Sequence, residues 1–218
     1  MCGRYTLSID DGRWIAERFD IRAPQALEPA VIHRFNVCPS ERVLVVDAER
    51  RTQTPAWGLG LPGGRGRASI NARAETAGTK PLFAPLIAGA AGRCLVPADG
   101  WYEWMRAERR AVRPAPFRYT VDDGGLFAFA GLRTHDAVVV LTTRPNEVCA
   151  RVHDRMPCVL AGPEAEAAWL DPALEPDALP ELLGPLAADR VTVTAASVEV
   201  NRAGREGPEL LEAEPTLF

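Results

Sequence analysis

The chain has 218 residues, of which 47% are hydrophobic and 25% charged, a composition typical of an ordinary globular protein rather than a disordered one. No apolar run approaches the ~20 residues that a membrane-spanning helix needs, and glycine and proline are too scattered for a collagen-like repeat. The formal net charge of −4 argues against a general polyanion binder unless the charge is unevenly placed.

The first half of the chain alternates between short regular elements and irregular stretches. Residues 8–11 are typical of a helix start, and Trp14, Ile15 and Phe19 are predicted to form one apolar face of that helix. Residues 20–42 are rich in proline and are expected to be irregular. Residues 58–66 contain five glycines and predict a flexible loop, whose spacing matches neither common nucleotide-binding glycine motif.

Apolar and β-branched runs predict six strands, at 43–47, 94–97, 117–121, 126–130, 137–142 and 191–195. The turn-like stretches between residues 117 and 142 indicate that three of these strands form an antiparallel meander. Helices are predicted at 163–170, where Pro163 and early acidic residues favour a helix start, and around 177–183. Several strands followed by a few helices predict an α+β fold, and we expect one domain spanning residues 1–218.

Positive charge is concentrated in residues 50–120, which carry a net charge of +8, whereas the rest of the chain carries −12. This asymmetry favours an anionic ligand, although arginines that only solvate the surface would give the same count. Lys80 is the only lysine, and arginine is the residue that best grips phosphate with two hydrogen bonds.

The five cysteines contain no C-x-x-C pair, and their odd number fits neither a disulfide framework nor a zinc site; they are Cys2, Cys38, Cys94, Cys149 and Cys158. We expect Cys94, Cys149 and Cys158 to be small buried hydrophobic residues. No signal peptide is visible, so a reducing, cytoplasmic location is expected, with no cofactor, metal or membrane as a partner.

Cys2 is the residue with the most informative chemistry. Removal of the initiator methionine, which a small second residue favours, would leave Cys2 as the first residue, with an amine and a thiol two carbons apart. The amine can form an imine with an aldehyde, and the sulfur can then close a five-membered thiazolidine ring, with the advantage of an intramolecular step. The alternative for an isolated Cys2 is a disordered tail with an incidental cysteine.

Three further polar segments bear on this choice, at residues 69–76, 97–104 and 152–157. In the second, Glu103 lies between aromatic residues, whose low-dielectric surroundings raise a carboxyl pKa and suit a general acid or base. The alternative is a strand residue that faces solvent. In the third, His153 is followed by Asp154 and Arg155, and this histidine is either functional or structural.

Eight short motifs occur in one order along the chain: Met-Cys-Gly-Arg-Tyr at 1–5, Asn-Val-Cys-Pro at 36–39, Trp-Gly-Leu at 57–59, Asn-Ala-Arg-Ala-Glu-Thr at 71–76, Arg-Cys-Leu-Val-Pro-Ala-Asp-Gly-Trp-Tyr-Glu-Trp at 93–104, Phe-Ala-Gly-Leu at 129–132, Leu-Thr-Thr at 141–143 and His-Asp-Arg-Met-Pro at 153–157. In this order, and from Cys2 to about Leu211, the chain resembles the SOS response-associated peptidase (SRAP) family of abasic-site-processing proteins.

The resemblance implies a single α+β domain with antiparallel, barrel-like sheets, short flanking helices and a positively charged groove for single-stranded DNA. It implies a partner strand containing abasic sites, whose ring-opened deoxyribose is an aldehyde. A stable thiazolidine cross-link to Cys2 would shield the lesion from strand cleavage during the response to DNA damage. Self-catalysed, peptidase-like removal of Met1 and a lyase-like Schiff-base activity are also implied, and we expect a monomer.

The resemblance also assigns roles to residues of this sequence. Cys2 would be the covalent nucleophile, Asn71 would hold its amine or thiol, Glu103 would shuttle protons, and His153 would protonate the sugar oxygen during ring opening. The DNA contacts it implies are phosphate contacts from arginine, base stacking from tryptophan and a backbone contact from threonine; the residues are Arg4, Arg73, Arg155, Trp104 and Thr142.

The sequence departs from the family pattern at a few positions. Residues 60–64 lack the tryptophans that many relatives carry there, which affects any base stacking or strand wedging by that loop. Pro145 stands where relatives usually have alanine. Cys38 and Cys158 replace small or branched apolar residues, and we expect both to be packing residues.

Two other functions compete with a covalent sensor of abasic sites. One is an N-terminal-nucleophile hydrolase, because glutamine amidotransferases also begin Met-Cys-Gly; these are usually fused to a synthase domain, for which 218 residues leave no room. The other is a non-enzymatic module that binds single-stranded DNA, which would bind intact and abasic strands equally.

Overall fold

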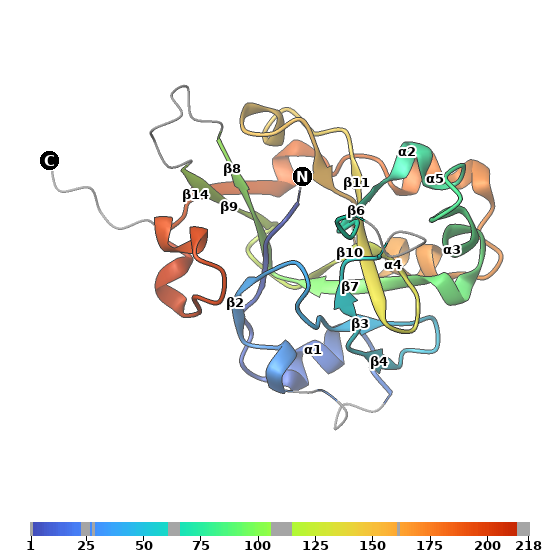
Figure 1. Cartoon of the computed structure of the whole chain (residues 1–218), viewed down its shortest axis with the longest axis horizontal. Coiled ribbons are helices and arrows are strands. Elements are labelled where there is room, and N and C mark those ends of the chain that lie inside the picture. The colour runs from blue at the N-terminus through green and yellow to red at the C-terminus, as the bar shows by residue number, and fades with distance from the viewer. Residues whose placement is uncertain are drawn as a thin grey trace, which may run out of the picture.

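The computed structural model describes residues 2–22, 27, 29–60, 66–105, 115–160 and 162–212. Most of the glycine-rich loop, residues 61–65, and five of the central arginines (Arg65, Arg106, Arg109, Arg110 and Arg113) lie outside these ranges. Within them, two mainly antiparallel sheets pack together with five short α-helices (Figure 1).

The smaller sheet carries the amino-terminal strand near its centre. Its five strands run in the order β14 (Val191–Ala195), β9 (Pro116–Val121), β8 (Gly100–Trp104), β1 (Tyr5–Leu7) and β2 (Arg34–Val37). All neighbouring pairs are antiparallel, and β1 pairs with β8 through Tyr5 opposite Trp101. This register directs the residues that precede Tyr5 toward the end of β8.

The larger sheet has nine strands, six of them in one continuous order: β12 (Met156–Pro157), β11 (Ala137–Thr143), β10 (Phe127–Arg133), β7 (Arg93–Ala98), β3 (Val45–Val46) and β4 (Thr52–Gln53). Beside them, β13 (Val159–Leu160) pairs with β10, and β5 (Ala56–Trp57) and β6 (Asn71–Arg73) run parallel to β11. Its central strands are buried on both faces, which explains their almost continuous apolar sequence.

Helices cover the larger sheet from different sides. Four of them, α2 (Ala74–Ala77), α3 (Ala84–Ala88), α4 (Pro163–Leu170) and α5 (Leu179–Leu182), gather at one side of the molecule, and α1 (Gly12–Arg18) lies at another (Figure 1). The side chain of Asp11 caps α1 by accepting a hydrogen bond from Arg13 N at 2.9 Å. No helix in the described ranges is both long enough and apolar enough to cross a membrane.

Aromatic side chains form the core where the two sheets meet. Tyr5 of β1 contacts Trp57 and Phe129 of the larger sheet edge to face, with ring centroids 5.3 and 5.9 Å apart. Trp101 of β8 reaches Phe129 at 6.2 Å. These rings are at most 1% exposed, so they fix β1, and the residues just before it, between the sheets.

The structure confirms much of the predicted element content. The strands at 94–97, 117–121, 126–130, 137–142 and 191–195 and the helix at 163–170 all form within about three residues of the expected limits. The strand predicted at 43–47 is reduced to β3. The second late helix is a 3-10 turn (Pro176–Ala178) followed by α5. The cysteines expected to pack are all buried and free, including Cys38 and Cys158.

Four expectations were wrong. Residues 20–42 are not irregular throughout, because Arg34–Val37 form β2 and pair with β1. The sheets do not close into barrels, since each has free edge strands. The three-strand meander does not form, because β9 pairs with β8 and β14 in the smaller sheet while β10 and β11 pair in the larger one. Ile15 and Phe19 of the expected apolar face are buried, but Trp14 is 64% exposed, and Ala16 is the further buried residue of α1.

Candidate functional site

Cys2 is enclosed at the start of β1. The residue is 0% exposed, and its Sγ lies 4.0 Å from the carbonyl oxygen of Arg4. Burial raises the pKa of the Cys2 thiol well above its usual range, and the nearby negative charge of Glu103 raises it further. The thiol is therefore neutral at rest, and its use as a nucleophile requires a base that accepts its proton.

Glu103 lies on β8 and is 3% exposed. This burial excludes the alternative of a solvent-facing strand residue. Burial raises the pKa of Glu103 to about 7, the negative charge of Asp154 adds to the rise, and the positive charge of the amino terminus opposes it. A carboxyl group with a pKa near neutrality can both accept and return a proton at physiological pH.

The loop that carries His153 approaches Glu103 from the larger sheet. It begins with the 3-10 turn Cys149–Arg151, and His153 N donates to Cys149 O at 3.0 Å. Both Asp154 and Cys149 interact electrostatically with Glu103, so the loop and the carboxylate face one another. Cys149 is buried, as expected, but it packs against the candidate site.

The imidazole of His153 is oriented by its own loop. Arg155 N donates to His153 Nδ1 at 3.0 Å, and Asp154 Oδ1 lies 3.0 Å from the same nitrogen. Nδ1 accepts the backbone hydrogen bond when it carries no proton and can donate to Asp154 when it carries one, so the two contacts favour different protonation forms of the ring. The ring lines a cavity of about 200 Å³ with Ala150, Val152 and Asp154.

Asn71 lies on the larger sheet, at the start of β6. Its Nδ2 donates weakly to Val140 O at 3.4 Å, whereas Oδ1 is buried and has no hydrogen-bond partner within the described ranges. An unsatisfied buried acceptor is unusual in a folded protein. No hydrogen bond joins Asn71 to Cys2 in the part of the chain that is described.

Arg4 and Trp104 are held by the carboxyl-terminal segment. Arg4 Nη1 donates to Asn36 Oδ1 at 2.7 Å and to Val200 O at 2.5 Å, and its guanidinium lies 5.9 Å from the centre of the Trp104 ring. Trp104 Nε1 donates to Asn201 Oδ1 at 2.8 Å. Both side chains thus have a defined orientation before any ligand arrives.

The guanidinium of Arg155 is already engaged. Its Nη1 and Nη2 donate to the two carboxylate oxygens of Glu75 at 2.8 Å each, and Nη2 also donates to Thr142 O at 2.5 Å. Thr142 itself is 2% exposed. A phosphate would have to displace Glu75 to gain a two-pronged contact with Arg155. Arg73, by contrast, is exposed at the start of α2.

Two residues near this site were not predicted from the sequence to act there. Tyr119 and Cys149 both interact electrostatically with Glu103, but nothing in their local sequence indicates it, since the contact depends on strand pairing and on a loop. No group of three potential metal ligands occurs among the residues that the structure describes.

The SRAP family model, described as SOS response associated peptidase, matches residues 1–203. The chain therefore belongs to the SRAP family. This membership agrees with the resemblance carried by the eight motifs and favours an abasic-site-processing protein over a glutamine amidotransferase.

Individual relatives match along nearly the whole chain. The abasic site processing protein YoqW of Bacillus subtilis is 38% identical, with 98% of this chain and 100% of the relative covered. The abasic site processing protein YedK of Escherichia coli is 30% identical over 97% and 99%. A crystal structure of a protein from Bacteroides thetaiotaomicron shares the fold with a TM-score of 0.84 at 20% identity, covering 98% of this chain and all of that one.

Proposed function

We propose that the protein forms a covalent thiazolidine cross-link between Cys2, freed of Met1, and the ring-opened sugar of an abasic site in single-stranded DNA. The observation that supports this most directly is the enclosure of the Cys2 thiol beside Glu103, whose pKa of about 7 suits proton transfer. The names of the relatives, abasic site processing proteins, agree with this substrate.

In the proposed reaction the Cys2 amine attacks the aldehyde carbon of the opened sugar, and the resulting carbinolamine loses water to give an imine. The thiol then adds to the imine carbon, its sulfur forming the new bond while its proton ends on the ring nitrogen. The net products are a thiazolidine and one water. Glu103 accepts and returns the protons of these steps, and His153 Nε2 protonates the sugar oxygen when the ring opens.

Asn71 and the DNA contacts complete the proposal. The free Oδ1 of Asn71 is an acceptor for the N–H of the terminal amine. Arg4, Arg73 and Arg155 bind phosphates, Trp104 stacks on a base, and Thr142 contacts the backbone, with Arg155 released from Glu75 on binding. The protein removes its own Met1, passes through a lyase-like Schiff base, and acts as a monomer.

The test is to mix the mature protein with single-stranded DNA containing one abasic site and to run the product under denaturing conditions. The expected result is a stable adduct that requires the abasic site and is lost in Cys2→Ser. Mass spectrometry first establishes that Met1 is absent, because a retained methionine blocks the chemistry. Absence of the adduct with the mature protein, or its survival in Cys2→Ser, would overturn the thiazolidine mechanism.

A further inference from the structure

Tyr119 lies one strand away from Glu103, on the same face of the smaller sheet. In the β8–β9 pair, Trp101 is opposite Tyr119 and Glu103 is opposite Phe117. Side chains of directly opposed residues share a face, and so do residues two apart on one strand. Tyr119 is therefore the diagonal neighbour of Glu103, and its ring stacks on Trp101 with centroids 5.1 Å apart and planes 15° from parallel.

The hydroxyl group of Tyr119 is buried without a hydrogen bond. The residue is 0% exposed, and its Oη has no partner within the described ranges. A phenol buried in this state is costly for the fold, and the neighbouring Tyr102 avoids the cost by donating to Phe35 O at 3.0 Å. The stack on Trp101 explains the position of the Tyr119 ring but not the retention of its hydroxyl group.

The surroundings of this hydroxyl group are those of the candidate site. Burial raises the pKa of Tyr119, and the negative charges of Cys149 and Glu103 raise it further. Among the described residues, the titratable groups that interact with Glu103 include the Cys2 thiol, the Cys149 thiol, the Tyr119 phenol and the Asp154 carboxylate, and the positive charge of the amino terminus also acts on it. Of these, the neutral phenol and the Cys149 thiol can donate a hydrogen bond without moving the terminal residue that reacts, and the hydroxyl group is the stronger donor.

We propose that Tyr119 is a positioning residue for Glu103: its O–H donates a hydrogen bond to the ionised Glu103 carboxylate and holds it toward Cys2 during the proton transfers. No bond to substrate is formed, and the phenol keeps its proton throughout. The inference rests on the proposed function for its role in the reaction. The shared face of the two side chains and their electrostatic interaction, which the resting structure shows without a hydrogen bond between them, are independent of that function.

The first test is Tyr119→Phe, which keeps the ring and its stack on Trp101 and removes only the oxygen. A hydrogen bond to a carboxylate favours its charged form, so its loss should move the titration of Glu103 upward by about one pH unit. Adduct formation limited by ionised Glu103 should then be roughly tenfold slower at pH 6 and nearly unchanged at pH 9. A pH–rate profile that superimposes on that of the wild type would overturn the proposal.

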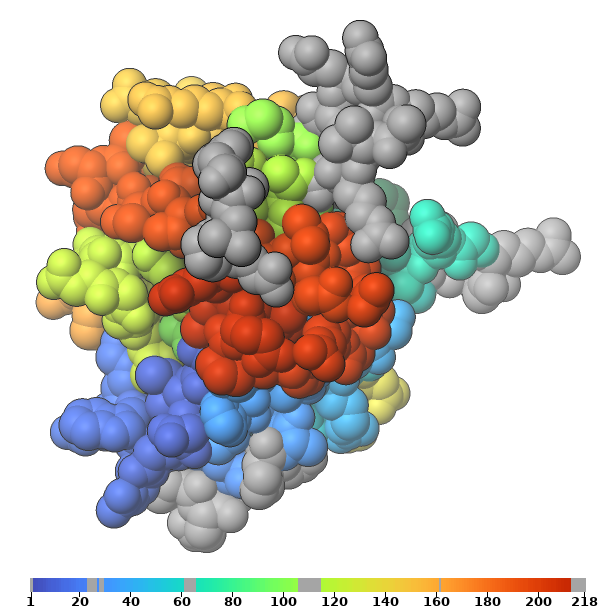
Figure 2. Space-filling view, turned by 90° about the vertical axis from the view of Figure 1, so that its left-hand side faces the viewer, coloured from blue at the N-terminus to red at the C-terminus, as the bar shows by residue number. Residues whose placement is uncertain are grey.

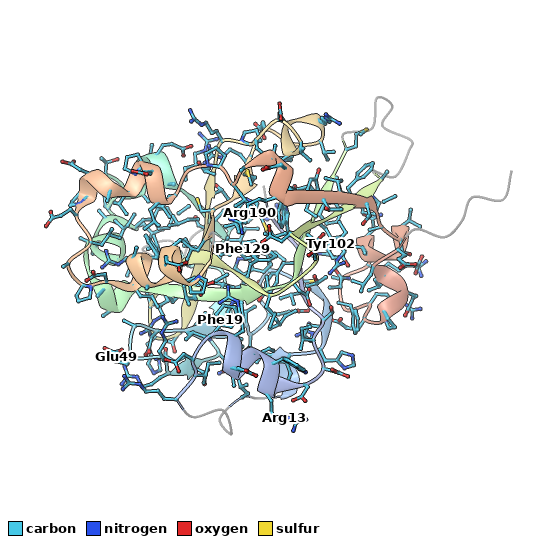
Figure 3. All side chains as sticks on the ribbon, turned by 180° about the vertical axis from the view of Figure 1, so that it is seen from behind. Arg13, Phe19, Glu49, Tyr102, Phe129 and Arg190 are labelled. Carbon is cyan, nitrogen blue, oxygen red and sulfur yellow. The ribbon has the colours of Figure 1, made fainter. Side chains whose placement is uncertain are left out.

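Tyr102→Phe is the matched control. Tyr102 directly precedes Glu103 on β8 and is as buried as Tyr119, but its hydroxyl group donates a hydrogen bond to Phe35 O. Figure 3 labels Tyr102 within the packed side chains of the smaller sheet. This variant should lower the melting temperature and leave the pH–rate profile in place. Equal displacement of the profile in both variants would show that general loosening is responsible, which contradicts a specific role for Tyr119.

A second experiment distinguishes the role of Tyr119 from the proposed cross-linking function. It measures the pH titration of the Glu103 carboxyl carbon by NMR in the DNA-free protein. An upward shift of its titration in Tyr119→Phe but not in Tyr102→Phe supports the contact, even if the wild-type protein formed no adduct and the proposed function failed. An unshifted titration, together with normal adduct formation by the wild type, overturns the role of Tyr119 and leaves the proposed function intact.

Discussion

Glu103 is a carboxyl group whose placement costs the fold stability at neutral pH. Burial raises its pKa to about 7, above the ordinary value of 4.5, so the native state holds this proton more tightly than the unfolded chain does. The contribution of protonated Glu103 to the free energy of unfolding is therefore fully present below the unfolded pKa. It decreases between about pH 4.5 and 7 and is absent at higher pH. Such a cost is typical of a group kept for its chemistry.

Glu103→Gln should therefore be more stable than the wild type at pH 8, by up to about 3 kcal/mol, and should show little advantage at pH 4.5. Urea unfolding of both proteins at the two pH values measures the difference. Glu147→Gln, at an exposed site, is the control and should give a small change at either pH. A gain that is the same at both pH values would contradict a raised pKa.

Glu75 competes with any phosphate for Arg155. Its carboxylate occupies both Nη atoms of Arg155 at 2.8 Å, and this hydrogen bonding lowers the pKa of Glu75, so the group stays ionised at neutral pH. It also lines a groove of about 580 Å³ between α2 and α5. The negative charge must therefore be displaced or shared when an anionic strand binds.

We expect Glu75→Gln to bind single-stranded DNA several-fold more tightly, with the salt dependence of log K steeper by roughly 0.7 for one additional phosphate contact. Fluorescence anisotropy over a series of salt concentrations measures both quantities. Glu49→Gln is the control, and it should change both quantities less. It removes an ion pair with Arg51 that is more exposed than that of Glu75 with Arg155, and Glu49 and Tyr102 lie on different sides of the view in Figure 3. Weaker binding by Glu75→Gln would mean that Glu75 instead orients Arg155 for the phosphate.

At the scale of elements, the sequence predicts best those strands and helices whose local amino-acid composition is enough to specify their secondary structure. The apolar runs of β7, β10 and β11 and the proline-started α4 are examples. β1 and β8 were not predicted as strands, because β1 has three residues and β8 contains a buried glutamate; both depend on pairing with each other and with β9.

The same distinction applies to the site. Cys2, Glu103 and His153 can be selected from their chemistry and the motifs that surround them. Tyr119 and the position of Cys149 could not, because their approach to Glu103 follows from the β8–β9 register and from the loop after β11. The pairing of Arg155 with Glu75 spans 80 residues and has no local signal either.

Gly131 of β10 marks a close approach of two strands in the larger sheet. A Cβ atom there would lie 2.8 Å from both Cys94 Sγ and Val96 Cγ2, two short side chains enclosed in the core. Gly131→Ala should lower the free energy of unfolding by about 1–3 kcal/mol through overpacking. Gly78→Ala is the control and should not change stability, because no atom lies within 4 Å of a Cβ atom placed there. Denaturant unfolding midpoints, at constant m-value, compare the two variants. Equal midpoints would contradict the close packing at Gly131.

At the scale of the whole molecule, the two ends of the described chain lie together. Asn36 Nδ2 donates to the carbonyl oxygens of Val200, Arg202 and Arg205 at 3.1–3.3 Å, and Glu206 accepts from Phe35 N at 2.6 Å. Figure 2 shows the carboxyl-terminal residues, in red, packed against the blue amino-terminal elements. The orientation of Arg4 and Trp104 thus depends on a segment that follows them by about 100 residues or more.

The burial of all five free cysteines, each at most 5% exposed, has a practical consequence for handling the protein. A bulky thiol reagent should find almost no reactive sulfur in the native chain and five in denaturant, so the ratio of the two titrations reports the fraction folded. In storage without reductant, dimers linked through sulfur should form only as molecules open. The rate of disulfide-linked aggregation would then report the rate of unfolding rather than the rate of oxidation at the surface.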